Sequence, residues 1–121
     1  MTVLVVDAAN VVGSRPDGWW RDRPGAALRL HARLVAADPA TEVVLVVEGA
    51  ARRGPAEGIE GPVRTVHAAG SGDDAIVEVA RDLADNGQDV VVVTADRALR
   101  QRVGAVGARV AGPSWLLEQL P

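Results

Sequence analysis

Four acidic residues stand where strand-like runs end or where the following helix begins: Asp7, Glu48, Asp73 and Asp96. In an open parallel α/β sheet, ligands bind at the carboxyl ends of the strands, so these four carboxylates are expected to meet in one crevice. Crowded like charges raise their pKa values or recruit a counter-ion, and all-oxygen ligands suit a hard cation such as Mg²⁺ or Mn²⁺. The pattern therefore predicts a divalent-metal site that supports phosphoryl chemistry.

Three of these acids also have a purely structural interpretation. An aspartate directly after a strand, such as Asp7, can close a turn through its own backbone. Asp96 can cap the helix that begins at the next residue, and this role is compatible with metal binding. Glu48 can instead form an ion pair with Arg52 or Arg53. Because the acids converge on one predicted edge, we favour metal ligation over the structural roles.

The remaining candidates are the helix-opening acids and two polar neighbours. Asp73 and Asp74 open a helix whose dipole favours acids, but the helical repeat places only Asp73 on the apolar side, which faces the sheet. Asp74 is the candidate for a supporting or second-metal ligand. Asn10 can hold Asp7 or a metal-bound water through its amide. The hydroxyl of Thr94 can bind a carboxylate, a metal-bound water or a helix-terminal amide.

Arginines and tryptophans in the loops near this edge are candidates for substrate binding. If those loops flank the crevice, the arginines can hold phosphates, whereas the alternative is that they are solvated surface charges. Trp19 and Trp20 form an aromatic pair between arginines, and nucleobases stack on such rings. Packing over the first helix or a dimer contact is the alternative for this pair. The candidate substrate-binding arginines are Arg15, Arg52, Arg53 and Arg97.

Strand-like and helix-like segments alternate along the chain. Continuous apolar runs predict strands that are buried on both faces, and helices with an apolar side lie between them. This alternation predicts a parallel α/β sheet with helices on both faces. The predicted strands cover residues 3–7, 42–48, 63–68, 90–94 and 108–111. The predicted helices run from Pro24 to near Asp38-Pro39, and over 73–86, 97–104 and 114–120.

Composition limits the possible chemistry. A chain of 121 residues is expected to form one domain, residues 1–121, and 48% hydrophobic with 24% charged residues is typical of a globular protein. There is no cysteine for a thiolate metal site or nucleophile, and all 13 basic residues are arginine, which excludes a catalytic lysine. The sequence has no signal-peptide pattern and no apolar run long enough for a membrane span, so we expect a cytoplasmic protein.

Three motifs, taken in order, resemble the PIN-like nuclease superfamily, and especially its NYN/YacP-like branch. Asp7-Ala-Ala-Asn10 is similar to the family's Asp-Gly-Tyr-Asn opening, from which the two alanines depart. Gly72-Asp73-Asp74-Ala-Ile76 is similar to its helix-opening acidic pair, and Thr94-Ala-Asp96-Arg97 to its late Thr/Ser-x-Asp-Arg element. Glu48 stands where relatives often carry an acid. The resemblance covers nearly the whole chain.

This resemblance implies a three-layer PIN-like (Rossmannoid) fold and a metal-dependent ribonuclease. The implied sheet has five parallel strands in the order 3-2-1-4-5. Mg²⁺ or Mn²⁺ bound to the acidic residues would activate a water that hydrolyses RNA phosphodiester bonds. RNA is the implied partner, and a homodimer or a protein partner is compatible with the family. The implied catalytic residues are Asp7, Asn10, Asp73, Thr94 and Asp96, with Glu48 and Asp74 as further metal ligands.

Other carboxylate-based α/β classes fit less well. A two-component receiver requires a lysine, a haloacid-dehalogenase-like phosphatase requires an aspartate where Ala9 stands, and a dinucleotide-binding fold requires a glycine-rich turn after the first strand. Two alternatives stay open within the PIN-like group. One is a catalytically inactive module that binds RNA or protein. The other is a toxin-type endoribonuclease of a toxin–antitoxin pair.

Overall fold

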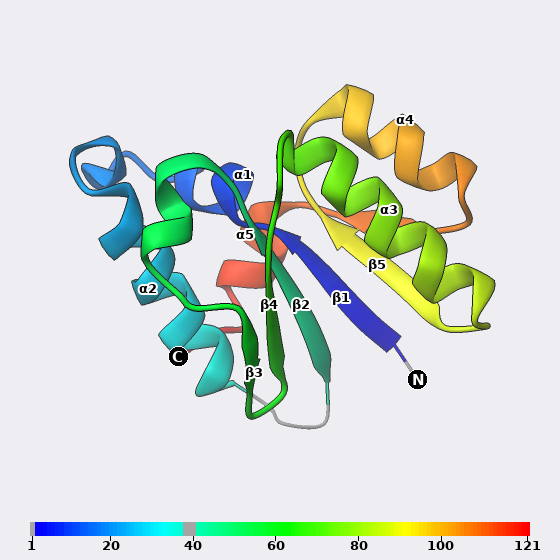
Figure 1. Cartoon of the computed structure of the whole chain (residues 1–121), viewed down its shortest axis with the longest axis horizontal. Helices are drawn as coiled ribbons and strands as arrows, with labels where there is room; N and C mark the ends of the chain where they lie inside the picture. Colours follow the sequence, from blue (N-terminus) through cyan, green and yellow to red (C-terminus); the bar gives the residue numbers. More distant parts are fainter. Residues whose placement is uncertain (1, 38–40) are drawn as a thin grey trace.

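The computed structural model describes residues 2–37 and 41–121 of the chain. Their strands form a six-stranded sheet in the order β3-β4-β2-β1-β5-β6, with helices on both sides (Figure 1). All neighbouring strands are parallel except β3 and β4, which are antiparallel. The strands are β1 (Thr2–Asp7), β2 (Glu42–Val47), β3 (Gly58–Glu60), β4 (Val63–His67), β5 (Asp89–Val93) and β6 (Arg109–Ala111).

The prediction of five strands in the order 3-2-1-4-5 is wrong in strand number and in the full order. The difference is β3, a three-residue edge strand that lies between the predicted strands 42–48 and 63–68, where no strand was predicted. Gly61 turns the chain back from β3 into β4 with a φ of +56°, a conformation that glycine adopts without strain. Because β3 is short and all its residues are exposed, no apolar pattern marks it in the sequence.

Four of the helices cover segments for which a helix was predicted, and three short ones were not predicted. The predicted end of the first long helix near Asp38-Pro39 lies outside the described residues, and the helix itself ends at Val35. None of the described helices is both long enough and apolar enough to cross a membrane. The unpredicted elements are α1 (Ala8–Gly13), η1 (Trp19–Arg21) and η2 (Gly49–Arg53). The others are α2 (Arg23–Val35), α3 (Gly72–Asp85), α4 (Arg97–Ala105) and α5 (Pro113–Leu117).

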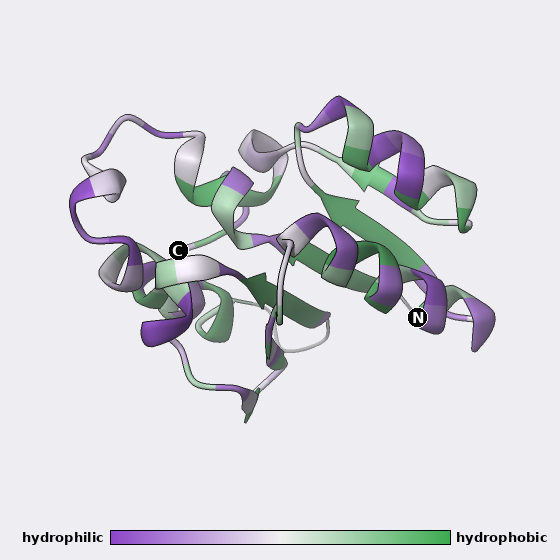
Figure 2. Cartoon of the chain, turned by 45° about the horizontal axis from the view of Figure 1, so that its top comes forward, coloured by the Kyte–Doolittle hydropathy of each residue, from purple (hydrophilic) through white to green (hydrophobic). Residues whose placement is uncertain are grey.

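The sheet is buried on both faces, which explains the uninterrupted apolar runs in its central strands. Successive side chains of β1 alternate between two cores: Leu4 and Val6 pack with α1, α2 and α5, whereas Val3 and Val5 pack with α3 and α4. Figure 2 shows the hydrophobic strands between helices that carry hydrophilic residues on their outer sides. The backbone of the central strands is therefore rigidly held up to the point where each strand ends.

Candidate active site

Asp7 is the last residue of β1, which lies between β2 and β5 in the sheet. Its side chain is only 5% exposed. One carboxylate oxygen accepts a hydrogen bond from the backbone N–H of Asn10 at 3.3 Å, and the other accepts one from the hydroxyl of Thr94 at 3.0 Å. The first bond caps α1, and the second joins the end of β1 to the end of β5. Asp7 is therefore fixed in orientation from both sides.

Thr94 and Asn10 connect Asp7 to the loop that carries Asp96. The Thr94 hydroxyl accepts a hydrogen bond from the backbone N–H of Asp96 at 3.2 Å, and the Asn10 side-chain oxygen accepts one from the N–H of Ala95 at 2.8 Å. Asn10 thus reaches Asp7 through its backbone, and its side-chain oxygen is used to hold the neighbouring loop. The two sequence motifs around Asp7 and Asp96 form one hydrogen-bonded unit.

Glu48 and Asp73 approach the same edge from β2 and α3. An oxygen of Glu48 accepts a hydrogen bond from the backbone N–H of Gly72 at 3.0 Å, which fastens the end of β2 to the start of α3. A Cβ atom at Gly72 would lie 2.5 Å from a Glu48 oxygen, so a larger residue there would require the Glu48 side chain to shift. Asp73 follows directly and is half-buried. The alternative interpretation of Glu48, an ion pair with Arg52 or Arg53, is not seen among the described residues, where Glu48 makes this backbone contact.

The acidic side chains affect one another electrostatically. Burial raises the pKa of the Asp7 carboxyl above its ordinary value, and the negative charges of Asp73 and Glu48 raise it further, although its two hydrogen bonds lower it. Burial also raises the pKa of Asp73, with added contributions from the charges of Asp96 and Glu48. Four carboxylates from four different segments therefore share one electrostatic environment at the carboxyl edge of the sheet.

The prediction that these carboxylates meet as one metal-binding group is not reproduced in the described residues. No three histidine, aspartate or glutamate side chains in residues 2–37 and 41–121 lie close enough together to hold a metal ion. Four of the five candidate acids already have a donor of their own: besides Asp7 and Glu48, Asp96 accepts from the N–H of Leu99 at 2.9 Å, and Asp74 pairs with Arg102 at 2.8 Å. The donor set still suits a hard cation, because it consists of oxygens that carry excess negative charge.

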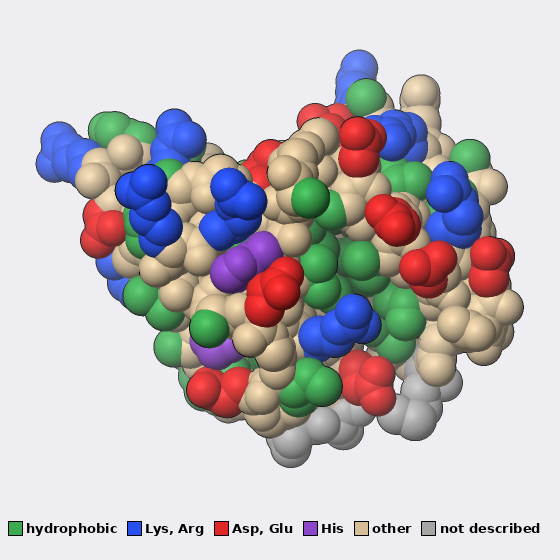
Figure 3. All heavy atoms as spheres, in the orientation of Figure 1, with side chains coloured by type: hydrophobic (Ala, Val, Ile, Leu, Met, Phe, Trp, Pro, Cys, Tyr) green, Lys and Arg blue, Asp and Glu red, His purple; other side chains and the backbone are tan. Residues whose placement is uncertain are grey.

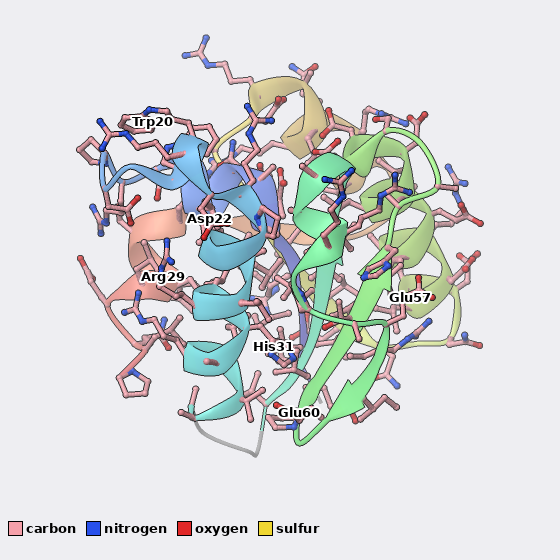
Figure 4. All side chains as sticks on the ribbon, turned by 60° about the vertical axis from the view of Figure 1, so that its left-hand side comes forward. Trp20, Asp22, Arg29, His31, Glu57 and Glu60 are labelled. Carbon is pink, nitrogen blue, oxygen red and sulfur yellow. The ribbon has the colours of Figure 1, made fainter. Side chains whose placement is uncertain are left out.

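The predicted substrate-binding side chains differ in how they are held: some form hydrogen bonds within the chain, and others are only exposed to solvent. Arg52 donates to the carbonyl oxygens of Gly49 and Ala68, so it fastens η2 to the loop after β4. Figure 3 shows arginine side chains gathered on the left of the upper surface, with acidic side chains to their right. Trp20 is 51% exposed and lies beyond the start of α2, whereas His31 lies farther along that helix (Figure 4). All four candidate arginines, Arg15, Arg52, Arg53 and Arg97, are exposed.

Two contacts made by arginines near the site were not predicted. Arg100 donates to the carbonyl oxygen of Thr94 at 2.9 Å and so supports the loop from α4. The guanidinium of Arg23 lies over the Trp19 ring, 5.5 Å from its centroid. Arg100 follows Asp96 by four residues, which is the spacing of one helical turn, and this spacing could have identified it. Nothing in the sequence indicates the Arg23–Trp19 contact.

Thr94 and Thr65 form a matched pair for testing the hydrogen bonds behind Asp7. Both are buried, but the Thr65 hydroxyl has no hydrogen-bond partner among the described residues, whereas that of Thr94 contacts Asp7 and Asp96. Thr94→Val is expected to lower the free energy of unfolding by about 1–3 kcal/mol, because the Asp7 carboxylate and the Asp96 N–H each lose a hydrogen bond with the Thr94 hydroxyl. Thr65→Val is expected to be neutral or stabilising. Urea denaturation of both variants measures the difference, and equal losses would contradict this assignment.

Comparison with known proteins identifies the fold through structure and not through sequence. No family model matches the chain, and the comparison with curated proteins gave no match. Two crystal structures of Rae1 (YacP) from Bacillus subtilis are similar to it, one of them of a mutant protein. The mutant superposes with a TM-score of 0.79 at 19% identity over 98% of this chain and 74% of that one. The other gives 0.76 at 18% identity over 98% and 72%. The chain therefore has the fold of Rae1 (YacP).

Proposed function

We propose that this protein is a metal-dependent ribonuclease of the NYN/YacP-like branch. The observation that carries the proposal is the position of Asp7, a carboxylate buried at the end of a central strand and hydrogen-bonded to Thr94. Burying a charged group costs free energy unless an opposite charge or hydrogen bonds compensate for it. Glu48, Asp73 and Asp96 add further negative charge around the Asp7 site. Function explains this arrangement better than packing does.

Each residue at the edge has a defined part in the proposed reaction. Asp7, Asp73 and Asp96, with Glu48 and Asp74, would hold Mg²⁺ or Mn²⁺, which when bound lowers the pKa of a water and neutralises charge on the phosphate. Thr94 and the Asn10 backbone keep the Asp7 carboxylate in a single orientation. The chain's own contribution is thus to fix oxygen ligands, since no side chain is needed as a covalent nucleophile.

The RNA substrate is inferred from the surroundings of the site and from the fold. Exposed arginines provide contacts for phosphates, and two tryptophans provide surfaces on which bases stack. The structural neighbour carries the name of the YacP-like branch, which the three sequence motifs also resemble. At 19% identity this likeness supports a shared fold, so the activity rests on the residues of this chain. A homodimer or a protein partner stays a prediction.

One observation favours a second candidate, a catalytically inactive RNA- or protein-binding module. In the described residues the acidic side chains are held apart by their own backbone and arginine partners. A nuclease then needs small rotations of these side chains to close a metal site, whereas a binding module needs none. The two candidates differ in whether RNA is cut or only bound.

Cleavage of RNA is expected to depend on added divalent metal. Purified protein is incubated with a fluorescent single-stranded RNA, a hairpin RNA and a DNA of the same sequence, in Mn²⁺, Mg²⁺ or EDTA. Shortened RNA products are expected with Mn²⁺ or Mg²⁺ and none in EDTA, because the proposed water is activated only beside the ion. Gel electrophoresis of the products measures the cut positions.

Binding measured on the same RNA separates the two candidates. Fluorescence anisotropy in EDTA reports binding without turnover. Binding without cleavage in either metal would give the lead to the binding module, and cleavage that continues in EDTA would exclude the metal-dependent reaction. Cleavage by Asp7→Asn as fast as by the natural protein would exclude the Asp7 site as the source of the activity.

A further inference from the structure

A cavity of about 260 Å³ opens beside the acidic edge, between α1, η1, α2 and η2. Its walls include Ala8, which follows Asp7 directly, and Glu48, so the cavity shares a border with the proposed active site. Pockets that take drug-sized ligands have volumes of about 300–1,000 Å³, so this cavity suits one smaller ring system. The remaining walls come from apolar or aromatic residues and one arginine: Ala9, Val12, Trp19, Arg23, Ala27 and Ala51, together with the backbone of Gly49.

The Trp19 ring is the only aromatic group on these walls, and neighbouring side chains fix its orientation. The ring of Trp20 packs against it in an edge arrangement, with centroids 5.9 Å apart and planes at 88°. The guanidinium of Arg23 lies over the same ring at 5.5 Å. Nucleobases stack both on aromatic rings and on guanidinium planes, and the cavity offers one of each.

The polar groups of the cavity are few and have opposite hydrogen-bonding roles. Glu48 can only accept hydrogen bonds when ionised, and Arg23 can only donate them. Every nucleobase carries donors or acceptors on its edge, whereas an aliphatic or lipid chain has none. The alanines among the lining residues add apolar surface, and their short side chains leave room beside the Trp19 ring. These features together select a planar heterocycle.

We propose that this cavity, which we call the Trp19 pocket, binds one unstacked nucleobase of single-stranded RNA. The proposal deepens the proposed ribonuclease function and rests on it for the identity of the ligand. A base seated beside Trp19 borders Glu48 and Ala8, the residue after Asp7, which brings the attached phosphate to the acidic edge. The pocket then determines which nucleotide of a flexible strand lies at the acidic edge. Double-stranded RNA, whose bases are stacked, cannot enter it.

Nuclear magnetic resonance of the three indole N–H groups tests the pocket without any cleavage. Trp→Phe variants assign the signals of Trp19, Trp20 and Trp115 in ¹⁵N-labelled protein. The four nucleoside 5′-monophosphates are then titrated in EDTA, with ribose 5-phosphate as the ligand that lacks a base. We expect the Trp19 signal to shift saturably with at least one nucleotide and not with ribose 5-phosphate. Trp115 lies beside the first residues of β1, away from the Trp19 pocket, so its signal is expected to stay at the same chemical shift.

Ala9→Leu provides a variant that fills the pocket from an exposed position on α1. It is expected to abolish the Trp19 shift while the rest of the spectrum keeps its dispersion. No Trp19 shift with any nucleotide, an equal shift with ribose 5-phosphate, or a shift that survives Ala9→Leu would each overturn the proposal. The indole signals themselves report whether each variant is folded.

Cleavage assays distinguish failure of the pocket from failure of the proposed function. Trp19→Ala is expected to raise the KM for single-stranded RNA about 5- to 150-fold, the range that one stacked base provides. Trp115→Ala is the matched tryptophan control and is expected to leave the KM within about twofold. RNA that is cut with an unchanged KM by Trp19→Ala would refute the pocket and leave the ribonuclease standing. Nucleotide binding at Trp19 without any cleavage would refute the ribonuclease and keep the pocket.

Discussion

Asp7→Asn is expected to abolish RNA cleavage while making the folded protein more stable at pH 7. Asparagine has nearly the same shape, so its side-chain oxygen can still accept from the Asn10 N–H and its amide can donate to the Thr94 hydroxyl. The substitution therefore removes one negative charge, keeps the bond from the Asn10 N–H and reverses the direction of the bond with Thr94. Since replacing outer partners of metal ligands costs about 10–100-fold, loss of this ligand is expected to cost more than about 100-fold in kcat/KM.

The stability gain follows from the raised pKa of Asp7. Burial first, and then the charges of Asp73 and Glu48, raise its pKa in the folded protein above the ordinary value of 3.8. Between pH 3.8 and the folded pKa, the folded state binds more protons than the unfolded state, so the free energy of unfolding falls as the pH rises. Above both pKa values, the full free-energy cost of burying the ionised Asp7 carboxylate remains. Asparagine cannot ionise, so Asp7→Asn is free of this penalty at pH 7 and gains nothing below pH 3.8.

Urea denaturation at pH 3.5, 5 and 7 measures this effect for Asp7→Asn and the natural protein. The stability difference is expected to favour the variant increasingly as the pH rises. Adding Mg²⁺ at pH 7 is expected to raise the Tm of the natural protein, because a ligand bound only by the folded state stabilises it, and to raise that of Asp7→Asn less. A variant that is less stable than the natural protein at pH 7 would show that Asp7 is a structural residue.

The position of the candidate site at one edge of the sheet could be predicted from the sequence. The runs that precede Asp7, Glu48 and Asp96 are apolar without alternation, and only a sheet covered on both faces buries such strands completely. Parallel strands then place their ends at one edge, so the order of strands and helices along the chain is sufficient to bring chain-distant acids to the same side. Hydrophobic burial determines where these strands lie in the sheet, and it is visible in the sequence as uninterrupted apolar runs.

The local contacts at that edge could not be predicted, because they depend on single hydrogen bonds. The sequence of α1 contains no apolar stripe long enough to indicate a helix, and it forms because Asp7 caps it. The side chain of Asn10 bonds to Ala95, 85 residues away in the chain, at a spacing that no pattern encodes. Whether acids within one crevice bind one another's donors or a shared ion depends on distances of a few tenths of an ångström.

Asp96 offers the sharpest separation of a structural role from a catalytic one. Its carboxylate accepts from the N–H of Leu99 at 2.9 Å and so caps α4. Asparagine caps helices about as well as aspartate, whereas alanine loses about 0.5–2 kcal/mol. We therefore expect Asp96→Asn to keep the natural stability and Asp96→Ala to lose about 1 kcal/mol, as measured by urea denaturation.

Asp96→Asn and Asp96→Ala are expected to differ in stability but to lose cleavage activity to a similar extent. If Asp96 supplies negative charge to a bound metal, both substitutions lower kcat/KM by more than about 100-fold, because neither side chain is ionised. Asp22→Ala is the matched cap control, since Asp22 caps α2 through the N–H of Gly25 at 2.9 Å. It is expected to lose similar stability with a far smaller loss of cleavage than Asp96→Ala. Natural activity in Asp96→Asn would instead leave Asp96 as a helix cap alone, and the ionised form of its carboxylate would then have no part in cleavage.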